Sequence, residues 1–285
     1  MSHATESDVV GAVARTALWT AAARAREHRR PDRLFSDPFA ALLAGTDGPA
    51  LLQHFHTPHA SREGNPFLPI RTRWFDDFLA GALAEGPRQV VALGAGLDTR
   101  AFRCSWPEGT VLFEIDQPEL LRYKERVLGE HGVAAGCERR LLEVDLAGDW
   151  TPALRAAGYR PAEPSVWFAE GVLFYLPPEA AVAVLGTAAV MAARGTRLAV
   201  DLIGTGVFRF PYTRVFLERL AAAGSPWQFG TDDPAGVVAA SGWDVVRLDE
   251  PGRPGADYGR WPAPATARGS DGLPRSFLVS ARRPE

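Results

Sequence analysis

The spacing of apolar residues divides the chain into two zones. In the first, up to about residue 85, apolar positions recur with helical periodicity, as they do between Ile70 and Leu83. From residue 88 onward, short apolar runs alternate with helical stretches. The pattern therefore predicts an N-terminal group of helices followed by a region in which strands and helices alternate.

Three helices are expected in the first zone. Residues 9–30 are rich in alanine and arginine, which favour helix, and a proline ends the stretch. A Ser-Asp-Pro sequence predicts the start of the next short helix, with Ser36 or Asp37 as its N-cap. The third helix is expected over 70–83 and stops at a Gly-Pro pair.

Apolar runs in the second zone predict seven strands. The predicted strands are 89–93, 110–115, 138–144, 165–169, 197–203, 243–248 and 275–281. The predicted helices between them include 118–130, 178–193 and 212–222. Runs without polar alternation are typical of a parallel sheet covered on both faces. We expect one Rossmann-like α/β domain over 88–285 with a mostly parallel sheet, and residues 1–87 as a helical cap on the same domain.

Composition and charge exclude several classes of protein. With 46% hydrophobic and 23% charged residues the chain can bury a core, which excludes general disorder. The net charge of −3 argues against a general nucleic-acid binder. We expect a cytoplasmic protein without a membrane segment, because no apolar run approaches ~18 residues and the N-terminus lacks a signal peptide. Cys104 and Cys137 provide neither a disulfide framework nor a cysteine metal cluster.

The first predicted strand runs into Gly94-Ala95-Gly96-Leu97-Asp98-Thr99. Glycines at such a turn let the backbone approach a ligand, and the next helix offers unpaired N–H groups. Ligands of open α/β sheets bind beyond the carboxyl ends of the strands, where this turn lies. A G-x-G alone is also compatible with a tight turn that binds nothing.

Acidic residues follow the next three strands. Glu114 and Asp116 come twenty and twenty-two residues after Gly94, the spacing at which a carboxylate binds ribose hydroxyls. Asp145 can accept from an adenine amino group while the next residue packs on the ring, and Glu170 would lie at the centre of the cleft. Each acid has a plainer interpretation as a helix cap or a salt-bridge partner. Their regular placement on neighbouring strand ends favours a nucleoside ligand.

The turn favours a nucleoside without a diphosphate. A nicotinamide dinucleotide is usually bound by G-x-G-x-x-G, but here the last position is Thr99. Asp98 also places a negative charge where a diphosphate would bind. S-adenosylmethionine has no phosphate, and the ammonium of its amino-acid part suits an acid. We therefore expect S-adenosylmethionine as the cofactor.

These motifs resemble the leucine carboxyl methyltransferase superfamily, within its branch of S-adenosylmethionine-dependent methyltransferases common in actinobacteria. The matching segments run in family order: Arg24-Ala25 with Glu27, 34–40, 71–73 with Asp76-Asp77, 93–100, 114–118, 145–146 and 169–177. The resemblance implies the class I methyltransferase fold. It is loose beyond residue 205.

The resemblance also implies roles for single residues. Gly94 would cradle the methionine part of the cofactor, and Asp116 would bind the ribose. Asp145 and Leu146 would hold the adenine. Arg71 would pair with the cofactor carboxylate, with Glu170 near its amino group. Arg24 is the second basic contact, although the helix register leaves Arg26 open. The remaining expected contacts come from the same turns and strand ends: Ala95, Gly96, Asp98, Thr99, Glu114, Gln117 and Gly171.

The acceptor is expected to be a small molecule, aromatic or anionic. Aromatic residues gather at 204–230, where they form either a lid or ordinary core. An arginine group between residues 24 and 33 is either a solvated face or a mouth that attracts anions. His54, His56 and His59 have metal-like spacing, but no single face presents all three, and we expect no metal site.

We expect O-methylation of a carboxylate to give a methyl ester. A carboxylate is already ionised at neutral pH, and no candidate base lies at a strand end. Arg73 or Arg24 would orient the acceptor, and Tyr175 would be an orienting donor. The alternatives are methylation of a hydroxyl, a protein that binds the cofactor without transferring a methyl group, and a nicotinamide-dependent oxidoreductase.

Overall fold

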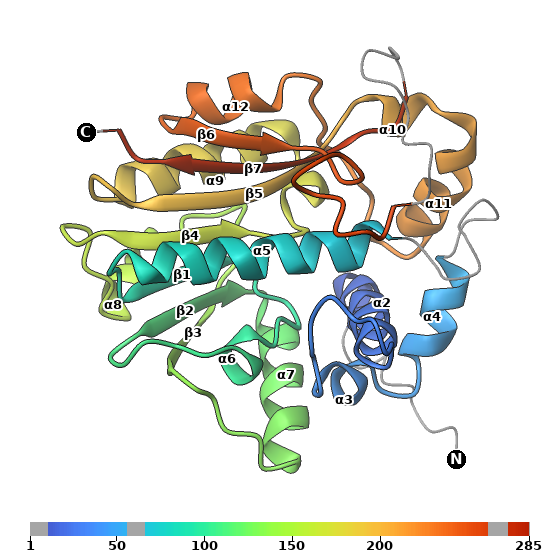
Figure 1. Cartoon of the computed structure of the whole chain (residues 1–285), viewed down its shortest axis with the longest axis horizontal. Coiled ribbons are helices and arrows are strands. Elements are labelled where there is room, and N and C mark those ends of the chain that lie inside the picture. Colours follow the sequence, from blue (N-terminus) through green and yellow to red (C-terminus); the bar gives the residue numbers. More distant parts are fainter. Residues whose placement is uncertain (1–10, 56–65, 262–272, 285) are drawn as a thin grey trace.

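The computed structural model describes residues 11–55, 66–261 and 273–284. A seven-stranded sheet forms its centre, with the strand order β3-β2-β1-β4-β5-β7-β6 (Figure 1). The strands are β1 Gln89–Leu93, β2 Val111–Asp116, β3 Glu138–Glu143, β4 Ser165–Ala169, β5 Arg197–Ile203, β6 Asp244–Asp249 and β7 Ser276–Arg282. All seven predicted strands are confirmed, to within one residue at each end.

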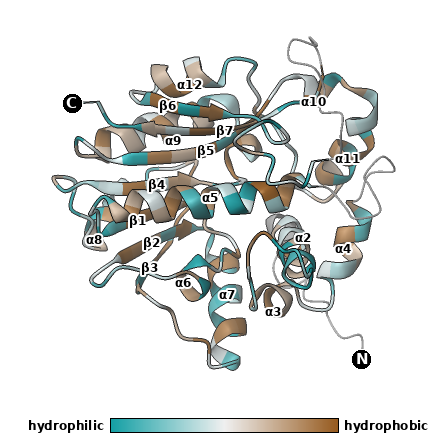
Figure 2. Ribbon diagram, viewed as in Figure 1, coloured by the Kyte–Doolittle hydropathy of each residue, from teal (hydrophilic) through white to brown (hydrophobic). Residues whose placement is uncertain are grey.

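The sheet is parallel from β3 through β5, and β7 is antiparallel to both of its neighbours. β1 and β4 are buried along their whole length. Figure 2 shows hydrophobic residues dominating these central strands. The unalternating apolar runs thus predicted the parallel, doubly covered part of the sheet correctly. The confirmed architecture is the mostly parallel α/β sheet expected for class I methyltransferases.

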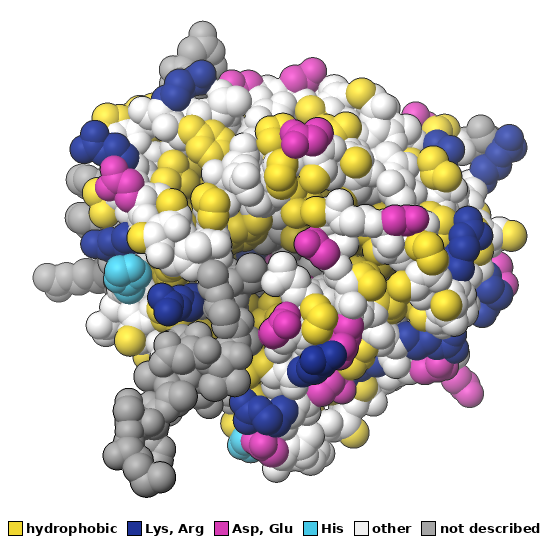
Figure 3. All heavy atoms as spheres, turned by 180° about the vertical axis from the view of Figure 1, so that it is seen from behind, with side chains coloured by type: hydrophobic (Ala, Val, Ile, Leu, Met, Phe, Trp, Pro, Cys, Tyr) yellow, Lys and Arg dark blue, Asp and Glu magenta, His cyan; other side chains and the backbone are white. Residues whose placement is uncertain are grey.

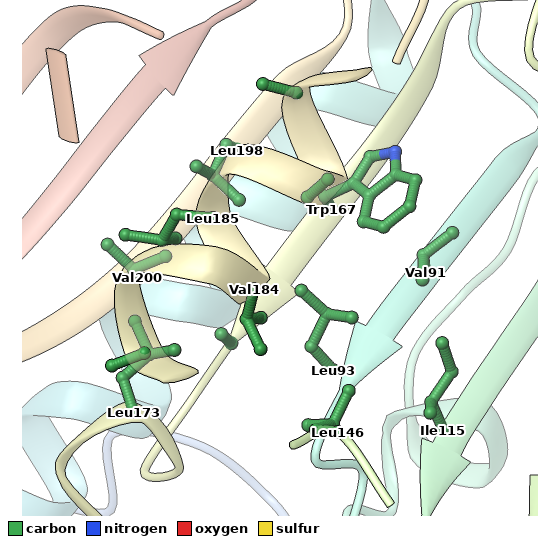
Figure 4. Close-up of a cluster of buried hydrophobic side chains, with 14 of the residues drawn as sticks. Val91, Leu93, Ile115, Leu146, Trp167, Leu173, Val184, Leu185, Leu198 and Val200 are labelled. Carbon is green, nitrogen blue, oxygen red and sulfur yellow. The ribbon is translucent and has the colours of Figure 1, made fainter. Parts of the chain in front are cut away.

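Helices cover both faces of the sheet. α5 Phe67–Ala84 packs on one face through Ile70, Trp74 and Phe75. α8 Thr151–Ala156, α9 Pro178–Met191 and α12 Pro234–Ala240 pack on the other. Figure 4 shows the second core, in which Val184 and Leu185 of α9 meet the strands.

The N-terminal helices lie at the carboxyl ends of the strands (Figure 1). α2 Gly11–His28 lies beside these ends and packs on α3 Ala40–Ala44, α4 Gly48–His54 and α5 (Figure 1). α7 Pro118–Glu130 packs against α3. The remaining short elements are α6 Arg100–Arg103, η1 Leu173–Tyr175, α10 Gly206–Arg209 and α11 Pro211–Ala222.

The predicted cap at the start of α3 is wrong. α3 begins at Ala40, and Phe39 precedes it with no side-chain cap. The carboxylate of Asp37 instead accepts hydrogen bonds from Arg24 and Thr99, so a tertiary contact takes the place of a local one.

Of the three spaced histidines, His54 ends α4, and His56 and His59 lie outside the described residues.

Neither a membrane-spanning helix nor a metal-binding cluster is found in the described ranges. No helix in them combines the length and the apolar character needed to cross a membrane. No cluster of metal-ligating side chains occurs in the same ranges. On the face shown in Figure 3, acidic and basic side chains are interspersed.

Candidate functional site

A cavity of about 280 Å³ lies at the carboxyl ends of β1, β2, β3 and β4. The turns that follow these strands contribute Gly94–Arg100, Asp116, Gln117, Val144–Leu146 and Glu170–Val172. α2 and α5 add Thr16, Ala17, Thr20, Arg24, Arg71 and Thr72, and residues 224–228 close another side. Segments distant in sequence therefore meet where the strand ends meet.

The turn after β1 needs its glycines. Gly94 has φ +70° and Gly96 has φ +44°, in the left-handed region that glycine adopts without strain. A Cβ on Gly94 would lie 2.6 Å from Cγ2 of Val172, so the turn passes directly under the segment after β4. The turn lines the cavity with backbone at both glycines, while the N–H groups of Gly94 and Ala95 donate to the carbonyl of Ile115 at the end of β2.

Asp116 is fixed at the cavity wall by two backbone donors. Its Oδ2 accepts from the N–H of Gly96 at 2.6 Å, and its Oδ1 accepts from the N–H of Gln117 at 2.7 Å. Burial raises the pKa of Asp116, although both N–H groups oppose the shift. The carboxylate thus joins the glycine turn to the end of β2, and its position follows the predicted spacing.

Glu114 does not reach the cavity. Its carboxylate is buried, accepts from Nζ of Lys124 at 2.7 Å and pairs with Arg139. It is absent from the cavity lining, so the expected cofactor contact at Glu114 is not supported. The acid of β2 that meets the cavity is Asp116, and Glu114 ties β2 to α7.

The end of β3 presents an acid and an apolar residue. Asp145 is exposed, and its Oδ1 accepts from the N–H of Ala147 at 2.9 Å. Leu146 is buried, and both residues line the cavity. The end of β3 therefore provides one hydrogen-bond acceptor, Asp145, beside one apolar side chain, Leu146.

Arg71 is held by two carboxylates at the end of β4. Its Nε donates to Oε1 of Glu170 at 3.1 Å, and its Nη1 donates to Oδ2 of Asp201 at 3.0 Å. Burial disfavours the charged guanidinium, but Asp201 and Glu170 raise the pKa of Arg71 overall. Its Nη2 has no hydrogen-bond partner among the described residues and lies beside Gly171. Arg71 can therefore still bind an anion in the cavity.

Arg24, rather than Arg26, lines the cavity from α2. Its Nε donates to Asp37 at 2.8 Å and its Nη2 donates to the carbonyl of Leu97 at 2.6 Å. Within the part of the chain that the structure describes, Nη1 has no hydrogen-bond partner. Two arginines thus face one cavity, each with a guanidinium nitrogen left for a ligand.

Asp98 and Thr99 belong to the same wall. Asp98 accepts from the backbone N–H of Arg100 at 2.6 Å and pairs with its guanidinium. Burial alone would raise the pKa of Asp98, but Arg100 and Arg103 lower it overall. Asp98 is thus ionised beside the glycine turn. Thr99 donates to Asp37 and contacts the cavity edge.

The two predicted acceptor contacts differ in outcome. Arg73 donates to Asp77 at 2.8 Å and to the carbonyl of Leu34, is partly exposed, and does not line the cavity. It is therefore not placed to orient an acceptor. Tyr175 lines the cavity, and burial raises the pKa of its phenol despite contacts with Trp227 and Thr16. The phenol stays neutral and can donate a hydrogen bond.

The aromatic segment meets the cavity only in part. Gly224, Ser225, Pro226 and Gln228 line it, whereas Phe208 and Tyr212 are exposed on α10 and α11. Phe216 and Trp227 pack with Trp19, Phe55 and Phe174. Packing accounts for these aromatic rings, and small or polar residues face the cavity.

Sequence reasoning missed several residues of the site. Asp201 holds Arg71 and also accepts from the N–H of Gly171 at 2.6 Å. A lone acid within the apolar run 198–203 was the available signal, because a buried charge needs a partner. Arg100 reaches Oε2 of Glu170 at 2.7 Å, and nothing in the local sequence indicates that contact.

A family model described as "Leucine carboxyl methyltransferase" matches residues 17–189. The chain belongs to the leucine carboxyl methyltransferase family. A relative in Saccharopolyspora erythraea is 41% identical over 266 residues, which cover 87% of this chain and 88% of the relative. Another in Mycobacterium avium is 44% identical over 262 residues, covering 86% and 83%. Both carry the name "Putative S-adenosyl-L-methionine-dependent methyltransferase".

Solved structures support the fold. A DUF574 family protein from Streptomyces avermitilis aligns with a TM-score of 0.55 and 17% identity, covering 91% of this chain and 97% of that one. An O-methyltransferase family protein from Burkholderia thailandensis aligns with a TM-score of 0.50 and 18% identity, covering 99% and 74%. The match to the leucine carboxyl methyltransferase family spans the cap residues Arg24 and Arg71 as well as all four strand ends of the cavity.

Proposed function

We propose that this member of the leucine carboxyl methyltransferase family is an S-adenosylmethionine-dependent O-methyltransferase that converts a small-molecule carboxylate to its methyl ester. One observation carries the cofactor assignment. Arg24 and Arg71 face the same cavity as Asp116 and Glu170, and each arginine keeps one guanidinium nitrogen without a partner among the described residues.

This donor set fits a nucleoside that ends in an amino acid. The two guanidinium groups can hold a carboxylate, and Glu170 can hold an ammonium beside it. Asp116 can accept from ribose hydroxyls, while Asp145 and Leu146 can hold the adenine. The ionised Asp98 makes the turn unfavourable for a diphosphate. When bound, the cofactor supplies an electrophilic methyl group on a sulfonium.

The acceptor side of the cavity is lined by neutral polar groups. Thr16 and Thr20 come from α2, Tyr175 from η1, and Ser225 and Gln228 from the segment after α11. A guanidinium paired with the acceptor would stabilise the reactants more than the transition state, in which the negative charge is being neutralised. Hydroxyl donors such as Tyr175 carry no charge, so they can orient a carboxylate while stabilising the reactants less than a guanidinium would.

Among the described residues, the acceptor side of the cavity has no acid or histidine that could serve as a base, which favours a carboxylate over a hydroxyl acceptor. No histidine lines the cavity within the described ranges. Glu170 is paired with Arg71 and Arg100, and Asp98 is paired with Arg100. A hydroxyl acceptor must lose a proton during the transfer, whereas a carboxylate has already lost it at neutral pH.

The stability of the product to alkali tests the acceptor type. The protein is incubated with S-adenosylmethionine labelled in its methyl group and with panels of carboxylic acids and phenols. We expect a labelled product that releases volatile methanol in mild alkali, as a methyl ester does. A labelled product that resists alkali would instead show hydroxyl methylation. Binding of the cofactor with no transfer to any acceptor would support a protein that binds it without catalysis.

A further inference from the structure

Asp37 is a buried carboxylate that contacts three cavity residues, Arg24, Thr99 and Arg103, without lining the cavity itself. It lies in the connection between α2 and α3, and its side chain is fully buried. Its Oδ2 accepts from Nε of Arg24 at 2.8 Å and from Oγ1 of Thr99 at 2.8 Å. Its Oδ1 has no hydrogen-bond partner among the residues that the structure describes.

A carboxylate in this position is costly. Burial of an acceptor without a partner costs stability, and burial of a charge costs more. The alternative role as the N-cap of α3 is not realised. The contacts that compensate the charge are the hydrogen bonds from Arg24 and Thr99 and a longer ion pair with Arg103, whose Nε lies 4.0 Å from Oδ2. All three residues line the cavity, and Arg24 is the one among them with a guanidinium nitrogen left for a ligand among the described residues.

We propose that Asp37 is a positioning residue that orients Arg24 toward the carboxylate of the bound cofactor. This inference rests on the proposed function. The guanidinium is planar, and two of its nitrogens are fixed by Asp37 and by the carbonyl of Leu97. These two contacts determine where the third nitrogen, Nη1, points. Removal of the first contact leaves the guanidinium held by the carbonyl of Leu97 alone, so its plane and the direction of Nη1 are no longer fixed.

The same carboxylate connects α2 to the glycine turn. Thr99 follows this turn directly and donates to Asp37, and Nε of Arg103 donates to Thr99 at 3.2 Å. Asp37 thus sets the position of Arg24 relative to the turn that carries Gly94 and Gly96. A cofactor that contacts both Arg24 and the glycine turn must match the distance between them.

Binding of two ligands by the variant Asp37→Ala, which removes the acceptor oxygen of the Arg24 contact, tests the role. S-adenosylhomocysteine contains the amino-acid carboxylate, and 5′-methylthioadenosine keeps the nucleoside and sulfur but lacks the amino-acid part. We expect the variant to bind S-adenosylhomocysteine at least about tenfold more weakly and to bind 5′-methylthioadenosine within about twofold of wild type. The control is Asp32→Ala, since Asp32 lies in the same connection, is exposed and pairs with Arg30.

Three outcomes would overturn the inference. Unchanged affinity for S-adenosylhomocysteine would show that Arg24 does not need Asp37. An equal loss for both ligands would show only a structural role for Asp37. A folded wild-type protein that binds neither ligand would overturn the proposed function as well, and so is distinguishable from the first two outcomes.

A second variant covers the case in which Asp37→Ala does not fold. Arg24→Lys keeps the charge, but an ammonium on a flexible stem lacks the planar fork. We expect the same selective loss of S-adenosylhomocysteine affinity. Wild-type affinity in Arg24→Lys would overturn the inference. If both single variants fold, the double variant should bind S-adenosylhomocysteine no more than about twofold more weakly than Arg24→Lys alone. Both changes disable the same contact, that of Arg24 with the cofactor carboxylate.

Discussion

Each arginine that lines the cavity shares a hydrogen bond or ion pair with a carboxylate. The pairs are Arg24 with Asp37, Arg71 with Glu170 and Asp201, Arg100 with Asp76, Asp98 and Glu170, and Arg103 with Asp76 and Asp37. These carboxylates hold the guanidinium groups in place and offset their charge. A cavity built this way suits a ligand with one carboxylate and does not suit a polyanion.

Tyr175 provides the most direct test of the acceptor side. The variant Tyr175→Phe removes one hydroxyl donor and keeps the ring packing against Phe174 and Trp227. We expect kcat to fall about tenfold or more, with affinity for S-adenosylhomocysteine within about twofold of wild type. Tyr212→Phe, on an exposed tyrosine of α11, is the control. Unchanged kcat would remove Tyr175 from the acceptor site.

Asp116 provides the corresponding test of the cofactor side. The variant Asp116→Ala removes the acceptor that two backbone N–H groups hold at the end of β2. We expect calorimetry to show a loss of more than about tenfold in affinity for S-adenosylhomocysteine. Glu143→Ala, at the end of β3 and paired with exposed Arg122, should change the affinity little. A smaller loss in Asp116→Ala would contradict its role in ribose binding.

At the scale of elements, the turn after β1 depends on the close approach of Val172. Gly94→Ala would place a Cβ 2.6 Å from that side chain, whereas Gly109, also with positive φ, has no atom within 4 Å of an added Cβ. We expect Gly94→Ala to lower the free energy of unfolding by about 1–3 kcal/mol more than Gly109→Ala, measured by denaturant titration. Equal effects would show that φ alone, and not the close contact, requires glycine.

A buried ion pair joins β2 to α7. Lys124→Met leaves the Glu114 carboxylate buried with Arg139 as its remaining ion-pair partner. Loss of one partner from such a pair costs about 3 kcal/mol, and we expect that decrease in the free energy of unfolding. Arg122→Met breaks an exposed pair with Glu143 and should cost less than about 1 kcal/mol. Equal costs would mean that the buried pair contributes little.

Elements were predictable from the sequence wherever burial was uniform. The strands 89–93, 165–169 and 197–203 were predicted without error because buried apolar runs bounded by turn residues have few alternative structures. The N-cap at Ser36 or Asp37 was predicted from local preference and was wrong. A contact with Arg24, thirteen residues earlier, decided the role of Asp37, and local preference does not contain that contact.

At the scale of the whole molecule, the cavity depends on the topology of the sheet. Parallel neighbours bring Gly94, Asp116, Asp145 and Glu170 to one edge, and each of these was predicted because its strand end was predicted. The partners of buried side chains were not predictable in this way. Glu114 lies two residues before Asp116 but pairs with Lys124, because the pairing depends on how α7 packs.

The most direct test of the central claim is calorimetric titration of the purified protein with S-adenosylmethionine, S-adenosylhomocysteine and a nicotinamide dinucleotide. We predict that the first two bind at one site per chain and that the dinucleotide does not bind. The two bound ligands share the nucleoside and amino-acid groups that the cavity fits. A folded protein that binds neither of them, or that binds the dinucleotide in their place, would contradict the account.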